Sequence, residues 1–172
     1  LKIGQIEFVD IDNDLDADLA ALAYKPDGSH HNVFTIFFKN NAGKFEYTSK
    51  TDSVFALTHT DSEIPKMSWA DRDNDGDYDL LLSGFLYKSS HFFENNAGVF
   101  TAKPSGNFPE ARGEPVWFDA NNDNRPDLLL PVTCDGELYV GQPGGGSALP
   151  QSLGLNNCND TRIQAFDYDN DG

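Results

Sequence analysis

The sequence contains few basic residues. Its 172 residues include 12 Lys and Arg against 28 Asp and Glu, which gives a formal net charge of -16 at pH 7. A chain of this charge is repelled by the phosphate backbone of DNA or RNA, and no stripe of Lys or Arg offsets that repulsion. We therefore exclude nucleic acid as a partner.

Long apolar runs and helical patterns are also missing. No stretch holds 18 or more apolar residues, and Gly or Pro interrupts every stretch that could place apolar residues at helical spacing. The first absence excludes a membrane-spanning helix, and the second predicts an all-β protein. Because 38% of the residues are hydrophobic, with 13 Phe among them, we expect a packed core and no extended disorder.

Cysteine is scarce, since Cys134 and Cys158 are the only two. They are compatible with one disulfide in an oxidising compartment, or with two separate buried thiols. Asn159 begins an N-glycosylation sequon, which points to the same compartment. We therefore expect a secreted protein, located outside the cell or at its surface.

The most informative feature that is present is an acidic nonapeptide with a carboxylate at nearly every second position. Complete copies occupy residues 10–18, 71–79 and 119–127, and residues 167–172 begin a fourth. The copies start 61, 48 and 48 residues apart, a spacing typical of the blades of a β-propeller.

A second repeat lies in the same order relative to the first. Residues 37–45 and 92–100 share the pattern Phe-Phe-x-Asn-Asn-Ala-Gly-x-Phe, in which Asn-Asn-Ala-Gly predicts a tight turn. A run of alternating apolar and polar residues precedes the acidic segment, and a compact apolar run follows it. Two further runs lie on either side of the Asn-Asn-Ala-Gly turn. We therefore predict four short strands in each unit. In the longer first unit, we interpret residues 25–32 as a polar turn insertion between the second and third strands. The Gly-rich residues 141–148 are expected to form a long turn between the third and fourth strands of the third unit.

The sequence therefore predicts a partial β-propeller of four-stranded antiparallel blades. Residues 1–172 would belong to one propeller domain, with blades at about 3–63, 64–113 and 114–160 and a truncated fourth at 161–172. We expect this arc to be completed by further blades, from the same chain or from another copy.

Spacing and chemistry indicate that the acidic segments bind Ca²⁺. Side chains at positions 1, 3 and 5 of such a loop converge on one point, and hard oxygen donors suit calcium. An EF-hand is excluded, because position 12 holds Ala21, Leu82 or Leu130 where an EF-hand needs Glu, and because a strand follows the loop.

The pattern resembles the FG-GAP and VCBS repeats of integrin-α-like β-propellers. That resemblance covers the whole chain and implies about one Ca²⁺ for each complete acidic loop, with the position 7 residue contributing its backbone carbonyl. The implied metal ligands are Asp10, Asp12, Asp14, Asp16 and Asp18 in the first loop, Asp71, Asp73, Asp75, Asp77 and Asp79 in the second, Asp119, Asn121, Asp123, Arg125 and Asp127 in the third, and Asp167, Asp169 and Asp171 in the fourth.

The three complete loops do not match the family equally well. The second matches at every position, whereas Leu15 stands in the first loop where the family has Gly, and a branched side chain disfavours a positive φ. In the third loop, Asn121 replaces an Asp and Asn124 stands at the turn position. We therefore expect the second loop to be the most regular site and the third to bind more weakly.

The resemblance implies an extracellular module that binds a protein or glycan, with calcium in a structural role. The sequence shows no nucleophile elbow, no phosphate-binding Gly loop and no Cys-based metal site, and we assign no catalytic residue. The four His residues lack a second ligand at a useful spacing. Two alternatives remain: the propeller domain of a carbohydrate-active enzyme of lyase or dehydratase type, and a structural subunit of a surface filament or scaffold.

Overall fold

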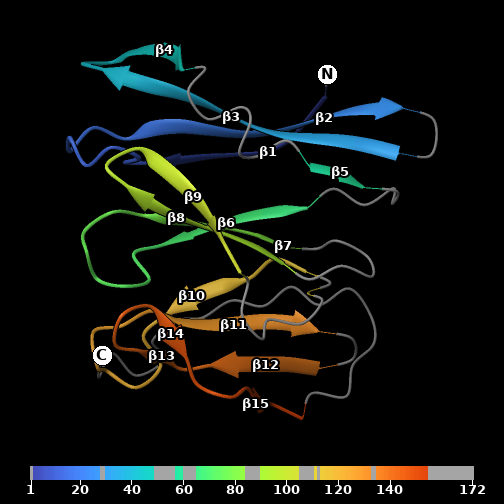
Figure 1. The fold of residues 1–172 in the computed structure, drawn as a ribbon, viewed down its shortest axis with the longest axis vertical. Coiled ribbons are helices and arrows are strands. Elements are labelled where there is room, and N and C mark those ends of the chain that lie inside the picture. Colours follow the sequence, from blue (N-terminus) through green and yellow to red (C-terminus); the bar gives the residue numbers. More distant parts are fainter. Residues whose placement is uncertain are drawn as a thin grey trace.

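The structure is a computed structural model whose regular secondary structure consists of strands. It describes residues 2–27, 30–48, 57–59, 65–83, 90–104, 111, 113–132 and 135–154. Three antiparallel sheets follow one another along the longest axis of the molecule (Figure 1). The all-β fold with four-stranded antiparallel sheets is thus confirmed, and the described residues include no helix that could span a membrane.

The first sheet has the strand order β1-β2-β3-β4, and its strands are β1 (Lys2–Val9), β2 (Asp18–Asp27), β3 (His30–Asn41) and β4 (Lys44–Thr48). A short strand, β5 (Leu57–His59), pairs with the beginning of β3. The second sheet repeats the four-strand order with β6 (Lys66–Ala70), β7 (Asp79–Ser83), β8 (His91–Asn96) and β9 (Val99–Lys103).

The third sheet contains β10 (Val116–Phe118), β11 (Asp127–Val132), β12 (Asp135–Tyr139) and β15 (Gln151–Ser152), in that order. Between its last two strands lies a separate hairpin of β13 (Gly141–Gln142) and β14 (Gly146–Ser147). The prediction that residues 141–148 connect the third and fourth strands is therefore confirmed.

The turns with the sequence Asn-Asn-Ala-Gly join β3 to β4 and β8 to β9. Both central residues have positive φ, +53° and +89° at Ala42 and Gly43, and +48° and +81° at Ala97 and Gly98. This backbone suits the right-handed twist of the flanking strands. The predicted tight turns are confirmed.

The interpretation of residues 25–32 as a turn insertion was wrong. Strand β2 continues to Asp27 and β3 starts at His30, with Lys25 paired to Asn32. Polar residues are tolerated in strands wherever the sheet faces water, so a polar composition alone does not distinguish a turn from an extended hairpin.

The core lies between the sheets. Val9, Leu22 and Phe37 of the first sheet pack in one cluster with Met67 and Leu80 of the second. A second cluster joins the second sheet to the third through residues 81 and 92 on one side and residues 128, 130 and 139 on the other. Consecutive leucines at 80–82 thus serve two different interfaces, because neighbouring residues of a strand point to opposite faces of the sheet.

The first strands of successive sheets are neighbours, in the order β1, β6, β10. The side-chain amide of Gln5 on β1 accepts a hydrogen bond from the Met67 backbone N–H (2.7 Å) and donates one to the Met67 carbonyl (3.0 Å). Trp117 on β10 donates to the Ser68 hydroxyl on β6 (3.0 Å). These bonds satisfy polar groups along strands that lie at the edge of their own sheets.

Candidate metal centres

The three complete acidic segments occupy the same place in each sheet. Residues 10–18 connect β1 to β2, residues 71–79 connect β6 to β7, and residues 119–127 connect β10 to β11. All three loops lie at the same side of the stacked sheets, at the left in Figure 1. The sequence repeat therefore corresponds to a repeated position in space.

Each loop is built on the same hydrogen bonds. The position 1 carboxylate accepts from the backbone N–H groups of positions 5 and 6, at 3.0 and 3.0 Å for Asp71. The corresponding distances are 3.1 and 2.9 Å for Asp10, and 3.1 and 2.7 Å for Asp119. The position 5 carboxylate accepts from the N–H of position 7 in all three. The carboxylates therefore hold the loop backbone through hydrogen bonds within the protein.

Positions 4 and 6 of every loop adopt positive φ. At position 6 the values are +72° for Leu15, +97° for Gly76 and +61° for Asn124. The sequence suggested that Leu15 would disturb the first loop, but Leu15 takes up the same backbone conformation as its counterparts. Its side chain is 90% exposed, so the loop tolerates it at the expense of backbone strain.

The Asp at position 9 is buried and connects the loop to a later strand, which is the third strand in the first two sheets and β13 in the third unit. In the second loop, the two oxygens of Asp79 accept from the N–H groups of Arg72 (3.2 Å) and Asn95 (2.9 Å). Asp18 makes the same pair of bonds with Ile11 and Asn40, and Asp127 with Ala120 and Gly141. Sequence reasoning expected only a metal ligand at this position and missed the structural role, because the donors are backbone N–H groups, which the sequence does not single out.

The position 7 side chains also have a role that the sequence did not reveal. Asp77 accepts a hydrogen bond of 2.8 Å from the Ala97 N–H, in the turn between β8 and β9. Asp16 makes the equivalent, longer contact of 3.4 Å with Ala42. The resemblance implied only backbone carbonyls at these positions, yet in the first two loops the side chains also bind the Asn-Asn-Ala-Gly turn.

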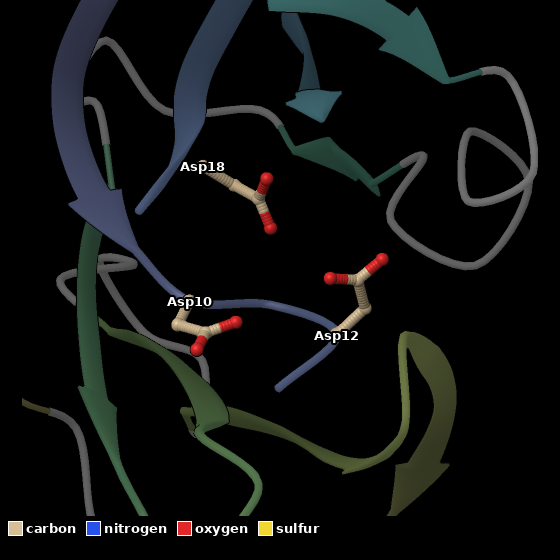
Figure 2. A group of neighbouring side chains, drawn as sticks. All are labelled: Asp10, Asp12 and Asp18. Atoms are coloured by element: carbon tan, nitrogen blue, oxygen red, sulfur yellow. The ribbon is translucent and has the colours of Figure 1, made fainter. Parts of the chain in front are cut away.

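Carboxylates converge within the first two loops. Asp10, Asp12 and Asp18 each have an oxygen within 4.8 Å of the others, and Figure 2 shows the three side chains facing a common space. In the second loop the converging group is Asp71, Asp73 and Asp75, at positions 1, 3 and 5, whereas the first loop uses positions 1, 3 and 9. No third group of this kind occurs among the residues that the structure describes, and the third loop has Asn121 in place of one acid.

The second loop fits a hard divalent cation well. Asp73 Oδ1 is buried and accepts no hydrogen bond. Asp12 Oδ1 in the first loop is also buried and accepts none. Burial raises the pKa of Asp79 to about 7 and, together with neighbouring Asp75, raises that of Asp73. Buried carboxylate oxygens without a partner are costly, and a cation among them removes that cost.

The first and third loops already contain a positive charge from the protein. The Lys39 ammonium on β3 contacts the carboxylates of Asp12 and Asp14, and its hydrogen bond lowers the pKa of Asp14. In the third loop, Arg125 Nη1 lies 3.0 Å from Asp123 Oδ2. These contacts place both cations directly on predicted metal ligands.

Successive loops contact one another. The Asn74 side-chain amide of the second loop donates to the Asn124 carbonyl of the third (2.9 Å). A Cβ built on Gly98 would lie 3.3 Å from that of Asp12, and one built on Gly145 would lie 3.1 Å from that of Asp73. Each of the first two loops thus packs against a turn of the following sheet.

Several predicted residues lie outside the part of the chain that the structure describes. They are Asp167, Asp169 and Asp171 of the fourth loop, Cys134 and Cys158 of the predicted disulfide, and Asn159 of the sequon. The unit expected at 161–172 lies there too, so these assignments stay predictions.

Comparison with known proteins supports the repeat assignment. Residues 71–130 match the family model of the FG-GAP-like repeat. The match begins at the first carboxylate of the second loop and ends within β11, so it spans the second loop and the third. No curated protein and no solved structure shows a significant match to the chain. The resemblance inferred from the sequence is confirmed for this segment.

Proposed function

We propose that this chain, whose residues 71–130 are FG-GAP-like repeat sequence, is a calcium-binding part of a β-propeller that acts outside the cell as a non-enzymatic binding module. The observation that carries the proposal is the second acidic loop. There Asp71, Asp73 and Asp75 converge, and a buried oxygen of Asp73 has no partner in the protein.

Calcium would be held by Asp71, Asp73, Asp75 and Asp79 in the second loop, and by the corresponding residues elsewhere. When bound, the ion supplies positive charge that neutralises the repulsion among these carboxylates. If each site has a dissociation constant of about 10⁻⁴ to 10⁻³ M, millimolar calcium adds about 0.4 to 1.4 kcal/mol per site. Sites this weak fill where calcium is millimolar, as it is outside cells.

An uncovered face of the first sheet supports the propeller. Phe8 of β1 and Tyr47 of β4 share one face with Leu19 and Phe38, and Phe8 is 66% exposed. The counterpart of Phe8 in the second sheet is Trp69, which packs against the core cluster between the first two sheets. A further blade would cover this apolar face just as the first sheet covers the second.

The turn between β3 and β4 also supports a further blade beside the first sheet. Gly98 and Gly145 lie in turns that contact the acidic loop of the preceding sheet, whereas a Cβ on Gly43 would meet nothing within 4 Å. Gly43 nevertheless has a φ of +89°, close to the +81° of Gly98. The first sheet thus has the same surface for receiving an acidic loop from another blade.

A binding role is favoured over the enzymatic alternative by the way the loop carboxylates are used. Most of them accept backbone N–H bonds within their own loop, as Asp71 and Asp75 do. Carboxylates that maintain loop structure are poorly suited to exchange protons with a substrate. Glycan-array binding without turnover would support the module, whereas product formed from an acidic polysaccharide would refute the non-enzymatic assignment.

The calcium proposal is tested by thermal unfolding of the 172-residue chain with calcium and with a chelator. We expect chelation to lower the melting temperature. Asp73→Asn should remove part of that difference, because Asp73 Oδ1 has no other partner. In chelator the variant should lose little or no stability, because Asn keeps an oxygen that can accept from the Asp75 N–H and removes the repulsion from Asp75 and Asp71.

The matched control is Glu46→Gln, which removes one negative charge at an exposed position outside the loops. It should retain the full calcium effect. Identical melting temperatures of the parent chain with calcium and with chelator would refute structural calcium.

A further inference from the structure

The first acidic loop contains an ammonium group supplied by the protein itself. Lys39 is on the third strand of the first sheet, and its Nζ contacts Asp12 Oδ2 and lies 3.1 Å from Asp14 Oδ2. Both carboxylates are calcium ligands under the proposed function. A cation from the chain therefore lies where it interacts with the same oxygens that an added cation would need.

This position carries the opposite charge in the second sheet. Lys39 immediately precedes Asn40, whose N–H bonds to Asp18, and Glu94 immediately precedes Asn95, whose N–H bonds to Asp79. Glu94 pairs with Lys103 (2.7 Å) and does not neutralise the loop beside it. One repeat position thus contributes a positive charge to the first loop and a negative charge near the second.

The third loop has a different internal cation. Arg125, at position 7, places its guanidinium 3.0 Å from Asp123 Oδ2, and Asn121 donates to the same carboxylate (3.2 Å). In the second loop, position 7 is Asp77, which is bonded to the turn between β8 and β9. The nearby Arg72 lies with its guanidinium over the Phe92 ring, 4.5 Å from the centroid, and the charges of Asp79 and Asp73 in the second loop also act on it.

We infer that Lys39 is a built-in counter-ion that occupies the first loop in place of calcium, so that the loops differ in calcium affinity and the second is the strongest site. Arg125 has the same effect in the third loop. This inference rests on the proposed calcium function and names the residues that set affinity within it.

The physical basis is competition for the same oxygens. Calcium entering the first loop must displace the ammonium from Asp12 and Asp14, or share their charge with it. A unit positive charge about 4 Å from a doubly charged ion weakens binding by a factor of roughly 10 to 30 even at the dielectric constant of water. Removing the ammonium should therefore increase the calcium affinity of the first loop by about that factor.

The experiment follows each loop separately in the 172-residue chain. Calcium is titrated while the backbone amide resonances of Leu15 and Gly76 report on the first and second loops, respectively. In the parent chain we expect Gly76 to respond at a lower calcium concentration than Leu15. In Lys39→Met, the Leu15 response should move to a calcium concentration about 10-fold lower, with little change at Gly76.

Lys44→Met is the matched control. It removes the same charge from the same sheet, but Lys44 is exposed and pairs with Glu46 (2.7 Å), which is not a predicted metal ligand. It should leave the Leu15 response almost unchanged. The reciprocal variant Glu94→Lys places an ammonium group beside the second loop, and it should weaken the Gly76 response by a similar factor.

A second readout does not depend on affinity. Without calcium, Lys39→Met should accelerate hydrogen exchange of the Leu15 amide, because Asp12 and Asp14 then repel each other with no cation between them. Added calcium should restore the protection. The Gly76 amide should show no such acceleration.

The outcomes separate the inference from the function on which it rests. If Gly76 responds to calcium while Lys39→Met leaves the Leu15 response and exchange unchanged, the counter-ion inference is wrong and the calcium function stands. If neither amide responds to calcium in the parent or in Lys39→Met, both are wrong. If Lys39→Met and Lys44→Met shift the Leu15 calcium response equally, the effect comes from net charge alone. That result would also overturn the inference.

Discussion

The buried side chain of Asn95 donates a 2.8 Å hydrogen bond to the carbonyl of Ile11, which belongs to the acidic loop of the preceding sheet. The same amide group donates to the Tyr78 carbonyl (3.1 Å), and its oxygen accepts from the Gly98 N–H (3.0 Å). Asn95 therefore ties together a loop, a turn and the neighbouring sheet. Among the described residues, the side chain of its repeat partner Asn40 bonds only to Ala17 and Gly43, both in its own unit.

Asn95→Ala should therefore destabilise the chain more than Asn40→Ala does. Both variants lose the bonds to loop and turn, but only Asn95→Ala leaves the buried Ile11 carbonyl without its partner. We expect a difference of about 1 to 3 kcal/mol in the free energy of unfolding, measured in urea. Equal losses in the two variants would show that the bond between sheets contributes nothing.

Leu15→Gly should stabilise the chain. Leu15 has a φ of +72° and an exposed side chain, so Gly relieves strain and loses almost no packing. The expected gain is about 1 kcal/mol in the free energy of unfolding, without calcium. Leu149→Gly, at another exposed leucine, is the control and should give no gain. A loss of stability in Leu15→Gly would mean that the side chain has a favourable role.

Gly144 and Gly145 form a natural pair for testing the contact between loop and turn. Their φ values are +74° and +75°, so Ala adds similar backbone strain at both. Only Gly145 faces Asp73, at 3.1 Å from an added Cβ, whereas Gly144 has open space. Gly145→Ala should cost roughly 1 kcal/mol more than Gly144→Ala and should weaken calcium binding by the second loop. Identical unfolding and calcium titrations for the two variants would contradict the contact.

The stability contribution of Glu7 should depend on pH. Burial raises the pKa of Glu7 above 4.5, a hydrogen bond from Gln5 lowers it, and the charge of Glu114 raises it. Because the folded state holds this proton more tightly than the unfolded state, the contribution is fully present below pH 4.5 and decreases as pH rises through the folded pKa. Glu7→Gln retains an acceptor for Gln5 and cannot ionise, so its stability relative to the parent should increase with pH.

The measurement for Glu7 is urea unfolding of parent and variant from pH 4.5 to neutral pH. Glu46→Gln makes the same change in net charge at an exposed ion pair, and its difference from the parent should vary much less with pH. A flat difference between Glu7→Gln and the parent would show that ionising Glu7 costs the folded state nothing.

The sequence was sufficient to predict the all-β fold, the order of strands and the position of the acidic loops between first and second strands. These features rest on local patterns, since alternation and turn residues act within a few positions of one another. The extended hairpin of β2 and β3 was mistaken for a turn insertion because its residues are polar. Local composition does not report whether a polar segment finds a strand to pair with.

The sequence by itself determined the repeated acidic loops, the oxygen donors that suit calcium and the turns that follow the third strands. Only the tertiary structure decided which charged side chains contact one another. Lys39 lies 27 residues from Asp12 along the chain and reaches it because β3 folds beside the loop, while the aligned Glu94 pairs with Lys103. The burial of Asp79 and the cross-sheet bond of Asn95 were likewise decided by packing. Electrostatic and hydrogen-bond partners depend on distances through space, and a linear pattern specifies those only within a single loop.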